Sequence, residues 1–306
     1  MTPQERSFEK FLDPVDGVLC LPAQSNASDV AKLAAPLGWR FPLWLDHRLS
    51  LLEQVRCSSY APASSRFGPY CDNITGMNWL FPDGRTVRVG ERVVKSTTGY
   101  DVLRLLLESG ERYGRPLDYV LRLRPLCDAS RTWHFRGEPP LLARAVSAIL
   151  HSSWIHWLES LEAIVSGETT LRATVHCPSD EVEVFEDYFS GLTKDHGLEI
   201  QTSDVVDFPK IGLPDFVVKT TVDRVLTTAF DLGGNPGVRC VALCSIGVVL
   251  GYVSDPVSIL KLLQPLERSL HPEGGDWRSR HVAGHSPVPP ESAWLAALRK
   301  EWGVNP

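Results

Sequence analysis

The second half of the chain carries an alternation of strand and helix patterns that occurs twice, which limits the folds open to it. LRATVHC (171–177) and LEIQT (198–202) are typical of strands, and the acidic amphipathic run between them (179–197) is typical of a helix. A related order returns over 216–253, where a helix pattern precedes two strand patterns. Two αβ units of similar length favour a duplicated α+β layer, although their similarity is too weak for a sequence repeat.

The length of 306 residues exceeds the usual size of one hydrophobic core and favours two domains. Hydrophobic residues make up 43% of the chain, which excludes wholesale disorder and a collagen-like chain. Longer helical patterns begin after residue 127. We therefore expect one domain over 1–127 and a second over 128–306, with a Pro/Gly-rich loop at 272–290 and a last helix in ESAWLAALRKEW.

The charge of the chain is unevenly distributed. The net charge of −6 argues against binding of nucleic acid by the whole surface. Between residues 84 and 124, however, nine Lys and Arg stand against five Asp and Glu, which makes this segment a basic island in an acidic chain. We expect no nucleic-acid partner, and we expect any anion site to lie in or near this island.

The N-terminal sequence MTPQERSFEKF contains charges of both signs and no apolar run, so we expect a cytoplasmic protein. The longest nearly uncharged stretch (241–253) is shorter than the roughly 20 residues of a membrane span, so we expect no transmembrane segment and interpret it as buried strand. The seven cysteines are widely spaced and include no CxxC pair, which favours reduced thiols over disulfides or a metal cluster.

The patterns in the first half of the sequence are typical of short helices and strands. Residues 17–45 are typical of strand, helix and strand, with Ser25 or Asn26 as the helix N-cap. Residues 50–76, rich in Ser, Pro and Gly, predict irregular backbone with at most one short strand. A hairpin turning at PDG (82–84), a helix over 97–110 and a strand ending at LRLRPL (121–126) are expected to follow.

The segment 64–101 has the composition of a ligand site. Its glycines, small hydroxyl side chains and cations, Arg66 and Lys95 among them, stand in expected loops. Such loops offer N–H groups and positive charge to a phosphate, and KSTTGYD (95–101) does so at an expected helix N-terminus. A turn-rich meander whose basic residues face solvent explains the same composition equally well, so the residues alone leave both interpretations open.

A family resemblance covers residues 64–126, about a fifth of the chain. The runs PDGRTVRVG, VKSTTGYD and LRLRP resemble the closing segment of the FAD-binding domain of the vanillyl-alcohol-oxidase (PCMH) type, as found in the FAD-binding subunits of glycolate oxidase. The sequence departs from that family in two places. The N-terminal RGGG loop that holds the FAD pyrophosphate in the family has no counterpart here, and ESGERYG (108–114) replaces the family's GS.GTLG motif.

This resemblance implies an α+β fold with a truncated PCMH-type FAD-binding domain, followed by an α+β ferredoxin-like cap domain. It also implies FAD as cofactor, with anion contacts from Arg66 and Lys95, backbone contacts to phosphate or ribose at Thr98 and Gly99, and support from the residues that follow. The cofactor-binding residues expected on this basis are Ser64, Ser65, Arg66, Gly68, Asn73, Lys95, Thr98, Gly99, Tyr100, Asp101, Gly110 and Gly114. No residue is identified as catalytic.

Two functions follow from these expectations. The first is an FAD-dependent oxidoreductase subunit, similar to glycolate oxidase, that oxidises a 2-hydroxy acid and passes electrons to a flavoprotein or iron–sulfur partner. Through such a partner it would lie peripherally at the inner membrane. The alternative is a non-catalytic subunit that has lost the flavin site and stabilises a catalytic partner. Whether the chain is an enzyme is left open by the sequence.

Other motifs in the sequence indicate no specific function. His281 and His285 have the spacing of a helical zinc pair, but they lie in the Pro/Gly-rich loop without the glutamate of an HExxH motif, so we expect no metal site. The sequence contains no GxSxG elbow, no Walker loop and no GxGxxG. Classical hydrolase, NTPase and Rossmann functions are therefore excluded.

Overall fold

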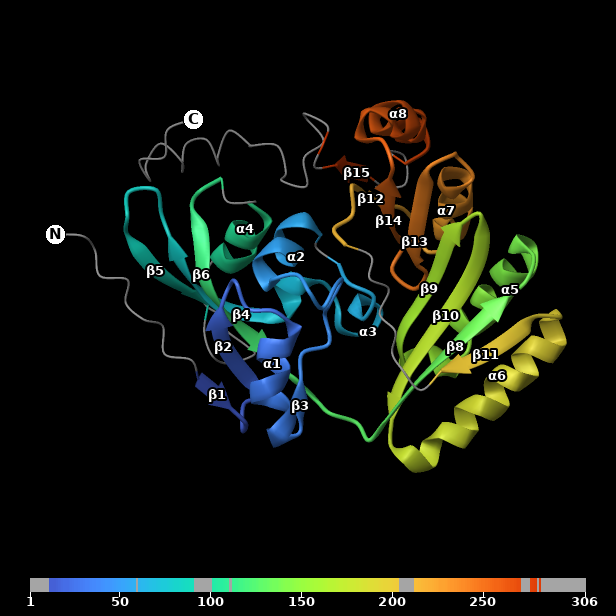
Figure 1. The fold of residues 1–306 in the computed structure, drawn as a ribbon, viewed down its shortest axis with the longest axis horizontal. Helices are drawn as coiled ribbons and strands as arrows, with labels where there is room; N and C mark the ends of the chain where they lie inside the picture. The colour runs from blue at the N-terminus through green and yellow to red at the C-terminus, as the bar shows by residue number, and fades with distance from the viewer. Residues whose placement is uncertain are drawn as a thin grey trace. The chain divides into compact units, whose positions relative to one another are not determined.

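The structure is a computed structural model that describes residues 11–58, 60–90, 101–109, 112–203, 212–270, 276–279 and 281. Its contacts divide the chain into two units (Figure 1). The described part of the first unit lies within 11–61 and 69–126, and that of the second unit lies within 62–68 and 127–281. The short segment 62–68 thus belongs to the second unit.

A five-stranded antiparallel sheet with the order β1-β2-β6-β4-β5 forms the centre of the first unit. Its strands are β1 (Phe11–Asp13), β2 (Val18–Pro22), β4 (Ile74–Leu80), β5 (Thr86–Gly90) and β6 (Arg115–Arg122). The helices of this unit are α1 (Ala27–Ala34), α2 (Leu51–Cys57) and α4 (Val102–Glu108), and β3 (Trp39–Arg40) pairs with β7 (Arg124–Pro125). The hairpin expected around PDG is confirmed, since Leu80 pairs with Thr86 across the turn.

Two expectations for the first unit are wrong. Residues 40–45 form no strand beyond the short β3, and the region 50–76 is not irregular, because it contains the helix α2 and the short helix α3 (Ser64–Phe67). The Ser50 hydroxyl accepts a hydrogen bond from the Glu53 N–H, and the Glu53 carboxylate accepts one from the Ser50 N–H. This capping box stabilises a helix of seven residues, too short to show a clear apolar period in the sequence. Of the two N-caps expected for α1, Ser25 and Asn26, the structure shows Asn26, which forms a capping box with Asp29.

A buried carboxylate joins two strands of this sheet. Asp118 on β6 is fully buried, and its two oxygens accept hydrogen bonds from the Asn78 N–H at 2.9 Å and from the Asn78 side-chain amide at 2.6 Å. Burial raises the pKa of Asp118 above its ordinary value of 3.8, although the hydrogen bonds from Asn78 and the charge of Arg88 lower it. The folded chain therefore holds this proton more tightly than the unfolded chain does.

We expect the Asp118→Asn variant to gain stability over the wild-type protein as the pH rises. Protonation of Asp118 contributes stability that is fully present below the unfolded pKa and is lost as the pH rises through the raised folded pKa, whereas asparagine does not titrate. In urea denaturation, the free energy of unfolding of the variant minus that of the wild-type protein should increase as the pH rises through this window. Above the folded pKa of Asp118 the difference should stay constant. If the free energies of unfolding of the two proteins changed with pH in parallel, the pKa of Asp118 would not be raised by folding.

The second unit contains an eight-stranded antiparallel sheet with the order β11-β8-β10-β9-β13-β14-β12-β15. Its strands are β8 (Ala129–Arg136), β9 (Leu158–Ser166), β10 (Glu168–Cys177), β11 (Glu199–Ser203), β12 (Phe216–Lys219), β13 (Val238–Leu243), β14 (Val248–Val253) and β15 (Asp276–Ser279). Its helices are α3 (Ser64–Phe67), α5 (Pro139–Leu150), α6 (Val182–His196), α7 (Val225–Gly233) and α8 (Ile259–Leu270).

This sheet consists of two copies of one topology. The elements β8-α5-β9-β10-α6-β11 and β12-α7-β13-β14-α8-β15 both follow the βαββαβ order, and each set of strands is arranged in the fourth-first-third-second order of a ferredoxin-like motif. The two copies meet where β9 pairs with β13. The duplicated α+β layer expected from the sequence is therefore present.

The two faces of the eight-stranded sheet differ. Side chains alternate between the faces of a strand, and one set packs with α5, α6, α7 and α8 into a single apolar core. Trp133 of β8 and Phe189 of α6 lie in this core with ring centroids 4.7 Å apart. Figure 1 shows α3 on the opposite side of the sheet from α5 and α7, in contact with β9. We call this second side the helix-free face, since the four longer helices do not cover it.

Among the described residues, no helix is long and apolar enough to cross a membrane.

Candidate functional site

Five of the residues expected to bind FAD lie outside the described residues. They are Lys95, Thr98, Gly99, Tyr100 and Gly110. The anion site expected at KSTTGYD therefore stays a prediction. Asp101 ends this motif and is described: its carboxylate accepts a hydrogen bond from the Arg104 N–H at 2.9 Å and so caps α4. Whether Asp101 also supports a ligand-binding turn stays a prediction, because residues 95–100 lie outside the described residues.

Asn73 in the first unit is fully buried, and its side chain bonds to other parts of the same unit. The amide donates to the Pro69 carbonyl at 3.0 Å, and its oxygen accepts from Arg124 at 2.7 Å. The Asn73 carbonyl also accepts from the Arg122 N–H at 2.8 Å. These contacts hold the chain before β4 against the end of β6, which gives Asn73 a structural role whether or not a ligand binds nearby.

Gly114 also has a structural role. Its φ of +128° is a conformation that side chains rarely adopt, and an added Cβ would lie 2.1 Å from the Leu80 carbonyl oxygen and 2.7 Å from the indole nitrogen of Trp79. The glycine thus allows the chain just before β6 to approach the end of β4 closely. A side chain at this position would therefore collide with β4.

The remaining expected residues lie on or next to α3 in the second unit. Ser64 is buried, Gly68 ends the helix with φ +79°, and the Arg66 guanidinium donates to the Trp157 carbonyl at 3.4 Å. The Ser65 hydroxyl is buried and has no hydrogen-bond partner among the described residues. It is therefore the one described member of the expected set whose side chain offers a buried, unpartnered polar atom to a ligand.

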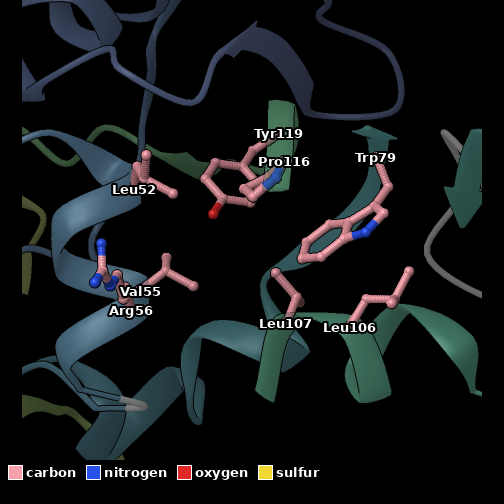
Figure 2. Close-up of a pocket in the computed structure, with 8 residues that line it drawn as sticks. All are labelled: Leu52, Val55, Arg56, Trp79, Leu106, Leu107, Pro116 and Tyr119. Carbon is pink, nitrogen blue, oxygen red and sulfur yellow. The ribbon is translucent and has the colours of Figure 1, made fainter. Parts of the chain in front are cut away.

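A small apolar pocket lies in the first unit between α2, α4 and the strands β4 and β6 (Figure 2). It is lined by Leu52, Val55, Arg56, Trp79, Leu106, Leu107, Pro116 and Tyr119. Its volume is about 10 Å³, roughly the space of one water molecule. Trp79 already donates its indole N–H to the Tyr113 carbonyl at 3.0 Å. This pocket is therefore too small for a flavin ring.

Polar side chains gather on the helix-free face of the second unit. Glu162 of β9 alternates with Leu161 and Ala163, which lie in the core, so its carboxylate is on the other face. One oxygen of Glu162 accepts from the Arg172 guanidinium of β10 at 2.6 Å, and the side chains are 0% and 4% exposed. A buried pair of this kind is costly to desolvate and stabilises a fold little by comparison with apolar packing. Its presence therefore calls for a functional explanation.

Further polar contacts extend this cluster. His176 of β10 lies 3.4 Å from the buried carboxylate of Glu159 and 3.4 Å from the Ser130 hydroxyl of β8. On the same strands the hydroxyls of Thr132 and Thr174 lie 3.2 Å apart. The first copy of the topology thus carries a buried polar network on its helix-free face.

Two buried oxygens on this sheet have no hydrogen-bond partner among the described residues. One is the second carboxylate oxygen of Glu162, and the other is the hydroxyl of Tyr252 on β14. Burial, together with the charges of Asp215 and Glu162, raises the pKa of the Tyr252 hydroxyl, against the charge of Arg239, which lowers it. The hydroxyl is therefore held in its neutral form and can donate a hydrogen bond.

The sequence analysis did not identify this cluster. A signal was present in LESLEAIVS, where two glutamates interrupt an otherwise apolar strand, since charged residues are seldom fully buried unless they are paired. The sequence analysis expected no metal site at His281 and His285. His281 lies 2.9 Å from Asp215. No group of three or more potential metal ligands occurs among the described residues, and His285 lies outside them.

Comparisons with known proteins identify a fold. No model of a protein family and no curated protein matches the sequence. Two crystal structures of alkyldihydroxyacetonephosphate synthase are similar to the chain. The first has a TM-score of 0.64 and 10% sequence identity over 97% of this chain, and the second has a TM-score of 0.60 and 13% identity over 86%. The chain spans 63% of the length of either. It therefore has the fold of alkyldihydroxyacetonephosphate synthase, a member of the FAD-linked oxidase family.

Proposed function

We propose that the chain is an FAD-dependent oxidoreductase subunit that oxidises a 2-hydroxy acid and passes the electrons to a flavoprotein or iron–sulfur partner. The observation that carries the proposal is the fold similarity to an FAD-linked oxidase, because it extends over 97% of the chain. The family-like motifs at 82–126 support it independently of the fold. Substrate class and partner come from the motif resemblance alone.

When bound, the flavin would supply the redox chemistry by accepting a hydride from the substrate carbon. The residues that would hold it are Arg66 and Lys95 for anionic groups and the backbone of Thr98 and Gly99 for phosphate or ribose. Because the family's pyrophosphate loop has no counterpart in the sequence, the proposal includes a partner chain that completes the cofactor site.

Bound FAD is expected to stabilise the protein. A ligand that binds only the native state adds about 2.7 kcal/mol to the free energy of unfolding at a hundredfold excess over its dissociation constant. We therefore expect FAD to raise the melting temperature measured by circular dichroism, and we expect the purified protein to show the visible absorption of a flavin that denaturation releases. A colourless protein whose melting temperature does not respond to FAD would contradict the proposal.

Site variants refine this experiment. Lys95→Ala should weaken FAD binding, whereas the matched variant Lys219→Ala, which removes a lysine from β12 of the second unit, should leave it unchanged. Equal affinities for both variants would count against the place of the expected anion contact.

The alternative function is a non-catalytic subunit that stabilises a catalytic partner. One observation favours it: the chain spans only 63% of the length of its structural relatives. This alternative predicts that FAD binds neither to the chain alone nor to the chain in complex with its partner. FAD binding in the complex alone would instead support a shared cofactor site.

A further inference from the structure

Strand β5 forms one edge of the five-stranded sheet in the first unit (Figure 1). Among the described residues it pairs with β4 alone, and four of its five residues are exposed, Val89 being the exception. The ladder runs without a bulge from Gly76 with Gly90 to Leu80 with Thr86. Natural proteins usually protect such an edge with a bulge, a proline or a covering element. β5 has neither a bulge nor a proline and its residues are accessible, so a further strand can pair with it.

The backbone groups that β5 directs outward follow from its pairing with β4. The Phe81 N–H donates to the Arg85 carbonyl at 2.9 Å, so these two residues form a hydrogen-bonded pair next to the turn. Hydrogen-bonded and non-hydrogen-bonded pairs alternate along an antiparallel ladder. Thr86 and Arg88 therefore belong to non-hydrogen-bonded pairs and direct their N–H and C=O groups away from β4. An added strand would form its hydrogen bonds with these groups.

The side chains of β5 determine which kind of strand fits this edge. Arg88 is exposed and lies opposite Asn78 of β4. Val87 is 45% exposed and lies on the other face of the strand, because side chains alternate. Arg115 at the start of β6 is also exposed, which adds positive charge to the same end of the sheet. The edge thus presents a positive charge on one face and an apolar side chain on the other.

We propose that β5 is a docking edge for an acidic, extended segment of another protein, which adds a strand to the five-stranded sheet. Opposite charges on neighbouring strands stabilise their pairing, so the segment carries an acidic residue beside Arg88 and apolar residues beside Val87. A second copy of β5 is disfavoured as the occupant, because it would bring another arginine to the same edge. This docking edge goes beyond the proposed function and does not rest on the binding of FAD.

Binding is measured with the full chain by the fluorescence anisotropy of a short labelled peptide in which glutamate alternates with valine. A peptide of the same length with lysine in place of glutamate should bind at least about tenfold more weakly, because like charges across an interface repel each other. Binding of the glutamate peptide should weaken as salt is added. The same peptide with N-methylated amides should not bind, since it lacks the donors that a strand requires. If the glutamate peptide does not bind, or binds no better than the lysine peptide, the proposal is wrong.

Variants test the place of binding. Arg88→Glu should reverse the preference, so that the lysine peptide binds more tightly than the glutamate peptide. Thr86→Pro removes an N–H that points away from β4, so the hairpin keeps its ladder while the peptide binds about tenfold more weakly. Lys261→Glu is the matched control, since it reverses an exposed charge on α8 of the second unit and should leave both affinities unchanged. Circular dichroism checks that each variant is folded.

The result for Arg88→Glu decides the proposal, because an exposed arginine is replaced without loss of a buried contact. A folded Arg88→Glu protein that still prefers the glutamate peptide would overturn the docking edge. The N-methylated peptide repeats the test of backbone pairing on the wild-type protein, so that test does not depend on the folding of Thr86→Pro.

The outcomes separate this proposal from the proposed function. Peptide binding that depends on Arg88, in a protein that does not bind FAD, would support the docking edge and contradict the oxidoreductase function. FAD binding without any preference between the two peptides would leave the function standing and reject the docking edge.

Discussion

Gly114→Ala is expected to unfold the first unit or to lower its free energy of unfolding by about 4 kcal/mol, the sum of backbone strain and overpacking of about 1–3 kcal/mol each. The new Cβ would lie 2.1 Å from the Leu80 carbonyl oxygen, and a backbone atom inside a sheet cannot move aside. It would also lie 2.7 Å from the Trp79 indole nitrogen, whose hydrogen bond to the Tyr113 carbonyl would be disturbed. Urea denaturation followed by tryptophan fluorescence measures the loss.

Gly84→Ala is the matched control for this experiment. Gly84 has a similarly unfavourable φ of +85°, but an added Cβ there meets no atom within 4 Å. Only the conformational cost remains, about 1 kcal/mol. If the two variants lost the same stability, the close approach of the chain at Gly114 to β4 would not explain why a glycine is required at this position.

Arg172→Met is expected to destabilise the second unit by about 3–5 kcal/mol. The substitution leaves the fully buried Glu162 carboxylate without the guanidinium that lies 2.6 Å away, and an uncompensated buried charge is far more costly than the loss of an exposed ion pair. Thermal denaturation at neutral pH should show the loss.

The double variant Glu162→Leu with Arg172→Met tests this explanation. Apolar side chains of similar volume often replace a buried ion pair without loss of stability, so the double variant should recover most of what the single variant loses. A double variant as unstable as Arg172→Met alone would mean that the lost packing of the arginine stem, and not the unpaired charge, causes the effect.

The sequence predicted those parts of the fold that depend on local signals. The PDG turn at 82–84 has strong turn chemistry, and the strand and helix patterns of the second half indicated a duplicated α+β layer; both are present. α2 was missed because its seven residues contain no full apolar period, and its capping box at Ser50 and Glu53 was the only sign of it.

The candidate site shows a different limit. A shared motif suggests which residues lie near a cofactor, but it does not distinguish a residue that binds a ligand from one that the fold itself requires. Asn73 and Gly114 are both required by packing in the first unit. Glu162 and Tyr252 are 90 positions apart, and only the pairing of β9, β13 and β14 brings them to one face. Pairing over such distances leaves no local pattern in a sequence.

The junction between β9 and β13 determines how the second unit can fold. The paired residues run from Val165 with Cys240 to Glu162 with Leu243, so each copy of the topology covers the open strand edge of the other. A single copy would expose unpaired N–H and C=O groups along that edge, a surface that promotes aggregation. This pairing also joins residues far apart in the chain, and its entropy cost has to be met before it stabilises the sheet. The unit is therefore expected to fold slowly, and the nascent first copy needs protection at β9 until β13 has been synthesised.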